Sequence, residues 1–175
     1  SNIFSAKTLN NFLKKNIGHF AFIIKRDTEL VAVVDHCRSI PLFFTNSVSS
    51  FTISNSANTL LENLFEPTID SVSALEFSMS GYVTEDRTIY KNINQIESGK
   101  WLWINESSQL KIFQYYNYLP VFNNTFSEKT LIKELGTAMD QSIDRVIKKA
   151  QGRPIWVPLS AGLDSRIILC KLHQK

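Results

Sequence analysis

Hydrophobic and polar positions alternate with different periods along the chain. Residues 7–16 place Leu9, Phe12 and Leu13 at helical spacing, which predicts an amphipathic helix that ends before Gly18. Short apolar runs bounded by polar residues follow, and these predict antiparallel strands with a first hairpin turn at 26–29. The predicted strands are 19–25, 30–35, 41–45 and 51–54.

Helical spacing returns at 57–65, and Asp70 is a suitable N-cap for a further helix that ends at Gly81. Strand-like segments reappear at 100–104 and 110–113. Two tryptophans in the first of these, at 101 and 103, alternate with aliphatic residues, so we expect core packing rather than ligand stacking. A tyrosine cluster after these strands is expected to pack between domains: Tyr115, Tyr116 and Tyr118.

A second region begins near residue 121. Asn123-Asn124 has the composition of a linker, and Thr125 with Glu128 forms a capping-box pattern that predicts a helix start. Apolar residues keep helical spacing to about Ala150, and Gly152 ends the helix. The chain therefore changes from a β-rich region to a helix–strand–helix order, which is typical of the start of a parallel-sheet domain.

Composition excludes several function classes. Of the 175 residues, 43% are hydrophobic and 20% are charged, and the net charge of +3 comes from dispersed basic residues, so we expect no nucleic-acid partner. Apolar runs fall short of the roughly 20 residues of a membrane span, and no membrane partner is expected. Cys37 and Cys170 form neither a disulfide framework nor a metal-binding spacing, which favours a reduced, cytoplasmic setting.

The strongest chemical signal lies at residues 155–166. An apolar run at 155–159 leads into a loop of small residues at 160–165, and helical spacing begins at Arg166. A strand, a tight turn and a helix direct free N–H groups and the positive end of the helix dipole toward an anion. The hydroxyls of Ser160 and Ser165 would add donors. The alternative is an ordinary β-α turn capped by serine and aspartate.

This loop resembles the pyrophosphate-binding loop of the N-type ATP pyrophosphatases, Ser-Gly-Gly-x-Asp-Ser. Ala161 replaces a glycine of that loop, at a cost of about 1 kcal/mol if the position needs a positive φ. The resemblance implies ATP and Mg²⁺ as cofactors. Asp164 would hold Mg²⁺, directly or through water, or would accept backbone N–H bonds. Leu159 would be an apolar wall near the nucleotide, or simply the end of a buried strand. The implied cofactor-binding residues are Leu159, Ser160, Ala161, Gly162, Leu163, Asp164 and Ser165.

Upstream motifs resemble the glutaminase domain of asparagine synthetases. Its Gly-x-Phe-Ala-Phe strand matches residues 18–22, and its Asp-x-x-Gly-x-x-Pro-Leu turn matches 35–42, with Arg38 in place of the glycine. The resemblance implies an α+β fold in two parts. Residues 1–120 would be an incomplete, antiparallel β-rich remnant of an N-terminal-nucleophile glutaminase-like domain. Residues 121–175 would be the first α-β-loop-α unit of an α/β ATP pyrophosphatase domain.

The resemblance implies part of an ATP-dependent amidotransferase that adenylates a small carboxylate, as in asparagine biosynthesis, and releases pyrophosphate. It also implies a homodimer. A second reading is an amide ligase with a vestigial glutaminase domain, similar to β-lactam synthetases. A third is a β-rich interaction module without catalysis. Because 121–175 cannot complete an adenine or acceptor pocket, we expect a fragment or a natural truncation that is inactive alone.

No catalytic residue is expected in this chain. The glutaminase of that family needs an N-terminal cysteine whose own amino group acts as base, and neither cysteine is terminal. Ser1 is not expected to be the nucleophile, because it stands only 17 residues before Gly18, where the family has several strands that carry its glutamine-binding residues. Asp35, His36 and Cys37 cannot converge as a triad, because consecutive strand residues point to opposite faces. An ion pair or a turn-forming role is expected for Asp35 and Arg38.

Overall fold

The computed structural model describes residues 5–47, 50–64, 66–120 and 127–175. It forms two compact units, Ser1–Leu119 and Pro120–Lys175, here called the first and second units. Each unit is described by itself.

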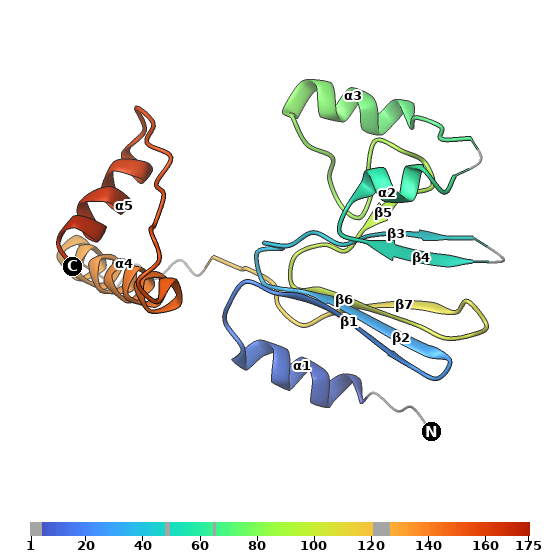
Figure 1. Ribbon diagram of the computed structural model, residues 1–175, viewed down its shortest axis with the longest axis horizontal. Coiled ribbons are helices and arrows are strands. Elements are labelled where there is room, and N and C mark those ends of the chain that lie inside the picture. Colours follow the sequence, from blue (N-terminus) through green and yellow to red (C-terminus); the bar gives the residue numbers. More distant parts are fainter. Residues whose placement is uncertain (1–4, 48–49, 65, 121–126) are drawn as a thin grey trace. The chain divides into compact units, whose positions relative to one another are not determined.

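Within its described residues, the first unit consists of two antiparallel sheets and three helices (Figure 1). The larger sheet has the order β1-β2-β6-β7 and the smaller has the order β4-β3-β5. This arrangement confirms an α+β class with antiparallel sheets. The strands are β1 Ala21–Arg26, β2 Glu29–Val34, β3 Phe43–Asn46, β4 Phe51–Ser54, β5 Asn94–Gln95, β6 Lys100–Ile104 and β7 Leu110–Gln114.

The core of the first unit lies on both faces of the larger sheet. One face buries Ala32, Val34 and Leu102 against residues of the smaller sheet, such as Phe44. The opposite face buries Val31, Val33 and Trp101 against Leu13 of α1 (Ala6–Lys15). The alternation follows from the two-residue period of a strand, and it buries the central strand β2 from Val31 to Val34. Trp101 also donates from Nε1 to Asn10 Oδ1 at 2.7 Å, so its predicted core packing is confirmed.

Local signals place the other two helices of the first unit. α3 (Ser71–Ser80) begins where Asp70 Oδ1 accepts from the backbone N–H of Ser73 at 2.8 Å, and it ends at Gly81, whose φ is 80°. Both ends confirm the sequence prediction. α2 (Ala57–Leu61) is shorter than the predicted 57–65. The predicted hairpin turn at 26–29 is confirmed by the pairing of Arg26 with Glu29.

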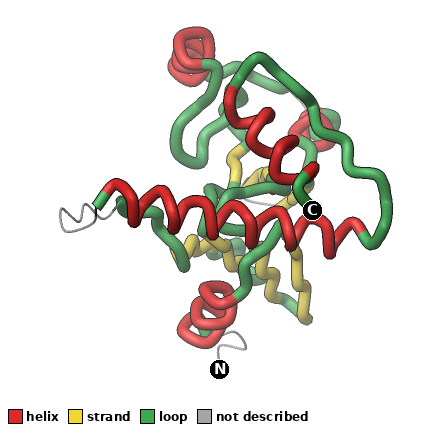
Figure 2. Tube along the Cα trace, turned by 90° about the vertical axis from the view of Figure 1, so that its left-hand side faces the viewer, coloured by secondary structure: helices red, strands yellow, loops and turns green. Residues whose placement is uncertain are grey.

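The described part of the second unit contains two helices, α4 (Glu128–Ala150) and α5 (Leu163–His173), joined by a long loop (Figure 2). α4 begins at Ser127, whose Oγ accepts from the backbone N–H of Thr130 at 3.2 Å. The predicted cap at Thr125 and the predicted linker at 123–124 lie outside the described residues. None of the helices in the described ranges is long and apolar enough to cross a membrane.

The predicted strand at 155–159 is wrong. These residues pair with no strand in the described part of the chain. A parallel strand is defined by its hydrogen-bonded neighbours, so an apolar run alone does not make one. The helix that follows begins at Leu163 rather than at the predicted Arg166, so Asp164 and Ser165 belong to its first turn.

Candidate functional site

Side-chain hydroxyls close the loop at 160–165 on itself. The Oγ atoms of Ser160 and Ser165 lie 3.0 Å apart. The backbone N–H of Ser160 donates to Ser165 Oγ at 3.1 Å, and that of Gly162 donates to Ser160 Oγ at 3.2 Å. The two serines therefore meet and fix the path of the backbone into α5.

Ala161 fits this loop without strain. Its φ is not among the positive values of the chain, so the cost expected for alanine in place of glycine does not arise. Gly162 is the N-cap of α5 with an ordinary φ of −70°. A Cβ built on Gly162 would lie 3.2 Å from Ser160 Oγ, so a larger residue there would shift that hydroxyl by a few tenths of an ångström. Arg166 brings positive charge to the loop by donating from Nη2 to Ala161 O at 2.5 Å.

The remaining predicted site residues are exposed around this loop. Asp164 lies in the first turn of α5, where the helix dipole favours a carboxylate. Leu163 is 71% exposed and Leu159 is 60% exposed. The reading of Leu159 as the end of a buried strand is therefore wrong. Together the loop offers two hydroxyls, one carboxylate and the N-terminus of an eleven-residue helix.

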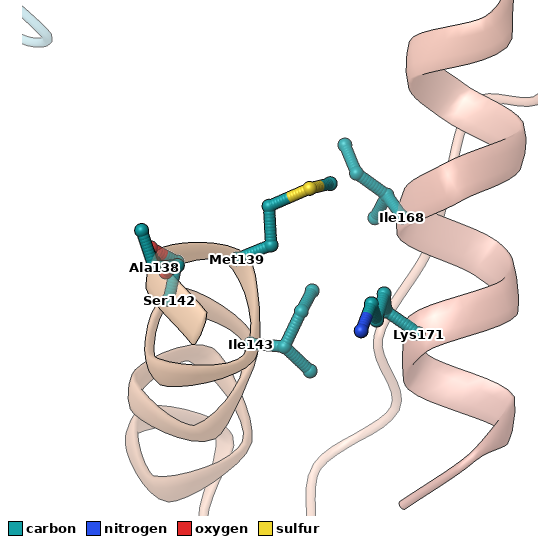
Figure 3. A pocket seen from close by; sticks show the side chains of 6 residues that line it. All are labelled: Ala138, Met139, Ser142, Ile143, Ile168 and Lys171. Carbon is teal, nitrogen blue, oxygen red and sulfur yellow. Dashed lines mark hydrogen bonds between the residues drawn. The ribbon is translucent and has the colours of Figure 1, made fainter. Parts of the chain in front are cut away.

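A shallow apolar pocket of about 220 Å³ lies elsewhere in the second unit, between α4 and α5 (Figure 3). Met139 and Ile143 of α4 point toward Ile168 and Lys171 of α5. The Lys171 ammonium pairs with Asp140 at 2.7 Å, which ties the two helices together. No residue of 159–165 lines this pocket, so it is separate from the loop.

A buried carboxylate organises the turn after β2 in the first unit. Asp35 is 1% exposed, and its side chain accepts from the backbone N–H groups of Phe20, Cys37 and Ser39 at 3.1, 2.8 and 3.1 Å. The Ser39 hydroxyl donates a fourth bond at 3.2 Å and also lies 2.7 Å from His19 Nδ1. The turn-forming role predicted for Asp35 is confirmed, whereas the link through Ser39 to His19 was not predicted.

Arg38 occupies the position where the related turn carries glycine, and its φ of 52° explains that preference. Its guanidinium lies over the Phe43 ring, 5.6 Å from the centroid. Partial burial lowers the pKa of this guanidinium, and its Nε is buried without a hydrogen-bond partner in the described structure. Asp35 takes its partners from backbone N–H groups and Ser39, so the turn does not depend on an ion pair with Arg38.

Tyr115 belongs to the core of the first unit, so the interdomain role predicted for it is wrong. Its hydroxyl donates to Val34 O at 2.8 Å, and burial, with a smaller contribution from the Asp35 charge, raises its pKa to about 12. Gly99 O accepts from the backbone N–H groups of Tyr115 and Tyr116 at 2.9 and 3.1 Å. Gly99 has a φ of 68°, and a Cβ there would lie 2.5 Å from Tyr116 O.

His36 and Cys37 lie in the turn that follows β2 rather than on a strand, so the predicted opposite-face arrangement does not apply to them. The His36 ring packs edge-on against Tyr115 and Tyr116, with ring centroids 5.3 and 4.4 Å apart. Cys37 is exposed with a free thiol, and so is Cys170 on α5. Within the described ranges, no three His, Cys, Asp or Glu side chains are grouped to hold a metal ion.

A family model for the glutamine amidotransferase domain matches residues 4–116, which is most of the first unit. The chain belongs to the glutamine amidotransferase domain family. The matched residues include the two sheets, α1 and the Asp35 turn. The loop at 160–165 lies beyond them. The family assignment therefore supports the glutaminase-like interpretation of the first region.

Among solved structures, the chain is similar to the glutamine phosphoribosylpyrophosphate amidotransferase from B. subtilis complexed with ADP and GMP. The identity is 19% and the TM-score is 0.41, and the similarity covers 68% of this chain and 21% of that chain. This chain thus spans about a fifth of the length of that relative. No curated protein matches it significantly.

Proposed function

We propose that this chain is part of an asparagine-synthetase-like amidotransferase that uses ATP to adenylate a small carboxylate. The observation that carries the proposal is the order of two features. A glutamine amidotransferase domain is followed by the Ser-Ala-Gly-Leu-Asp-Ser loop at the N-terminus of α5. In this proposal the first unit belongs to the ammonia-supplying half of the protein, and the loop serves the step that releases pyrophosphate.

The loop suits an anion that gains charge during reaction. Free N–H groups in the first turn of α5 and the helix dipole are already oriented, so stabilising a departing pyrophosphate needs little reorganisation. The hydroxyls of Ser160 and Ser165 now bond to each other, and they would exchange that bond for phosphate oxygens. Arg166, beside Ala161 O, adds a cation within the same turn.

Asp164 fits a role as ligand to Mg²⁺. Mg²⁺ in nucleotide sites is usually held by one or two carboxylates together with substrate phosphates and water. One exposed carboxylate beside two hydroxyls meets that requirement. The metal would supply charge neutralisation for the phosphates when bound, while the protein's own N–H groups and hydroxyls orient them.

The proposal is tested by isothermal titration of ATP with Mg²⁺, and of pyrophosphate with Mg²⁺, into the wild-type chain. We expect Asp164→Ala to weaken binding at least tenfold, which corresponds to about 1.4 kcal/mol. Glu134→Ala, which removes an exposed carboxylate from α4, is the matched control and should bind like wild type. Equal affinity of the two variants would contradict the proposal.

A further inference from the structure

His19 is the exposed end of a row of hydrogen bonds that starts at the buried Asp35. The ring Nδ1 of His19 lies 2.7 Å from Ser39 Oγ, and the same Oγ lies 3.2 Å from Asp35 Oδ1. The three side chains come from two segments, the bend before β1 and the turn after β2. One hydroxyl therefore links an exposed imidazole to a carboxylate that is 1% exposed. We call these three side chains the Asp35–Ser39–His19 relay.

Backbone hydrogen bonds hold the two segments of the relay together. The N–H of Phe20 donates to Asp35 Oδ2 at 3.1 Å, and the N–H of Asp35 donates to Phe20 O at 3.0 Å. The N–H of Ser39 also donates to Asp35 Oδ2, at 3.1 Å. The backbone beside His19 and the backbone of Ser39 are thus fixed to one carboxylate. The ring and the hydroxyl are therefore positioned before any ligand binds.

The number of hydrogens in the relay decides the tautomer of His19. Three backbone N–H groups point at Asp35, so its carboxylate acts as an acceptor, and a serine hydroxyl has a single hydrogen to donate. The carboxylate is the stronger acceptor, because a hydrogen bond to a charged oxygen is roughly twice as strong as a neutral one. If Ser39 gave its hydrogen to His19, Ser39 Oγ and Asp35 Oδ1 would face each other at 3.2 Å as two acceptors. Ser39 therefore donates to Asp35, and its oxygen accepts from Nδ1–H of His19.

The Nδ1–H tautomer leaves the lone pair of the ring on Nε2. In a neutral imidazole one nitrogen is a donor and the other an acceptor, and the hydrogen bond of the first determines which is which. A carboxylate linked to the donor nitrogen also raises the basicity of the free one. Within the described ranges, no three His, Cys, Asp or Glu side chains are grouped to hold a metal ion. A covalent role for this lone pair therefore fits the surroundings of His19 better than metal binding.

We propose that the relay makes Nε2 of His19 a nucleophilic site that is modified by an activated acyl group, such as that of an anhydride. Nε2 forms a bond to the carbonyl carbon, and the bond from that carbon to its leaving group breaks, with the electron pair going to the leaving group. The Nδ1 proton of the acylated ring then passes to water. The inference goes beyond the proposed function and does not depend on it, because it uses no residue of the loop at 160–165.

The charge of the relay favours an acyl donor over a phosphoryl donor. Asp35 takes part in no ion pair within the part of the chain that the structure describes, so its negative charge is not neutralised near His19. Phosphoryl donors carry negative oxygens that this charge repels, whereas the carbonyl carbon of an anhydride is uncharged. The same carboxylate, through Ser39, stabilises the positive charge that develops on the ring during attack.

Nitrogen NMR of the His19 ring tests the tautomer directly, at about pH 8.5, where an ordinary imidazole is neutral. We expect wild type to show a protonated Nδ1 and an unprotonated Nε2. Ser39→Thr, which keeps the hydroxyl, should give the same spectrum, whereas Ser39→Ala should give a mixture of both tautomers. His19→Gln identifies the signals by their loss. A wild-type ring with its proton on Nε2, or a spectrum unchanged in Ser39→Ala, overturns the proposal.

Reaction of the full chain with diethyl pyrocarbonate, an anhydride, at the same pH tests the reactivity. Peptide mass spectrometry gives the rate at each histidine, and His173, exposed at the end of α5, is the internal control. We expect His19 to react at least about threefold faster than His173 in wild type and Ser39→Thr, and at the rate of His173 in Ser39→Ala. The alanine is smaller than the serine, so a slower reaction cannot come from blocked access, and circular dichroism checks that the variants are folded. Equal rates for His19 and His173 in wild type, or a His19 rate unaffected by Ser39→Ala, overturn the proposal.

Discussion

At residue 35 a carboxylate accepts four hydrogen bonds, three from the turn at Cys37 and Ser39 and one from Phe20 before β1. Three of those donors are backbone N–H groups, and their bonds to Asp35 are partly buried. The same turn places Arg38 at a positive φ, which costs about 1 kcal/mol relative to glycine. The bonds to Asp35 therefore stabilise a turn whose sequence is otherwise unfavourable.

Asp35→Ala should lower the free energy of unfolding by about 3 kcal/mol, because it leaves several partly buried donors without their acceptor. Asp35→Asn should also destabilise the protein, since one of its two acceptor oxygens becomes an NH₂ donor that faces other donors. Urea denaturation followed by tryptophan fluorescence measures both effects. Glu106→Ala, at an exposed turn residue, should change stability by less than about 0.5 kcal/mol. An Asp35→Ala variant as stable as this control would contradict the assignment.

At the scale of elements, the ends of α3 were predictable but its orientation was not. Asp70 and Gly81 act within one turn of their own positions, so the sequence alone identifies them. Which side of a helix faces inward depends on distant residues, here Arg87, and α3 has its polar side inward. The predicted strand at 155–159 fails for the same reason, because strand formation depends on residues far away in sequence.

Acid should weaken the anchoring of α3. Hydrogen bonds from Thr84, with the Arg87 charge, hold the pKa of Glu76 below its ordinary 4.5, and the Ser73 N–H lowers the pKa of Asp70 below 3.8. A carboxyl with a lowered pKa in the folded state stabilises the fold fully above its unfolded pKa. That contribution to stability is lost as the pH falls from the pKa of the unfolded state through the lower pKa of the folded state.

We therefore expect the stability of the wild-type chain to fall below about pH 4.5, and that of Glu76→Gln to fall less steeply because residue 76 no longer titrates. Urea denaturation at a series of pH values measures both curves. Glu106→Gln, whose carboxylate is exposed in a turn, should follow the wild-type curve. Parallel curves for wild type and Glu76→Gln would show that the titration of Glu76 does not contribute to the pH dependence of stability.

At the scale of the whole molecule, the two units differ in how much they bury. The first unit holds both hydrophobic clusters, with residues such as Val33, Trp101 and Leu102 at or below 1% exposure. In the described part of the second unit only Ile143 is buried, while Trp156 is 90% exposed. Apolar burial is the main favourable term in folding, so the stability of the chain resides in the first unit.

A chain of residues 1–119 should therefore melt within about 3 °C of the first unit in the full chain. Near-ultraviolet circular dichroism is suited to this measurement because the buried Trp101 stacks on Phe113 in that unit. Residues 120–175 alone should show helical signal without a cooperative transition. A fall of more than about 10 °C in the shortened chain would mean that the second unit stabilises the first.

The thiols of the chain are distributed between the units, with Cys37 in the first and Cys170 in the second, and both are exposed. The native sequence thus provides one attachment point for a fluorescent dye in each unit. The backbone of Cys37 is held in place by a hydrogen bond from its N–H to the buried Asp35. Energy transfer between a donor and an acceptor dye on these thiols would follow the separation of the units in solution, and its response to added nucleotide, without an engineered cysteine.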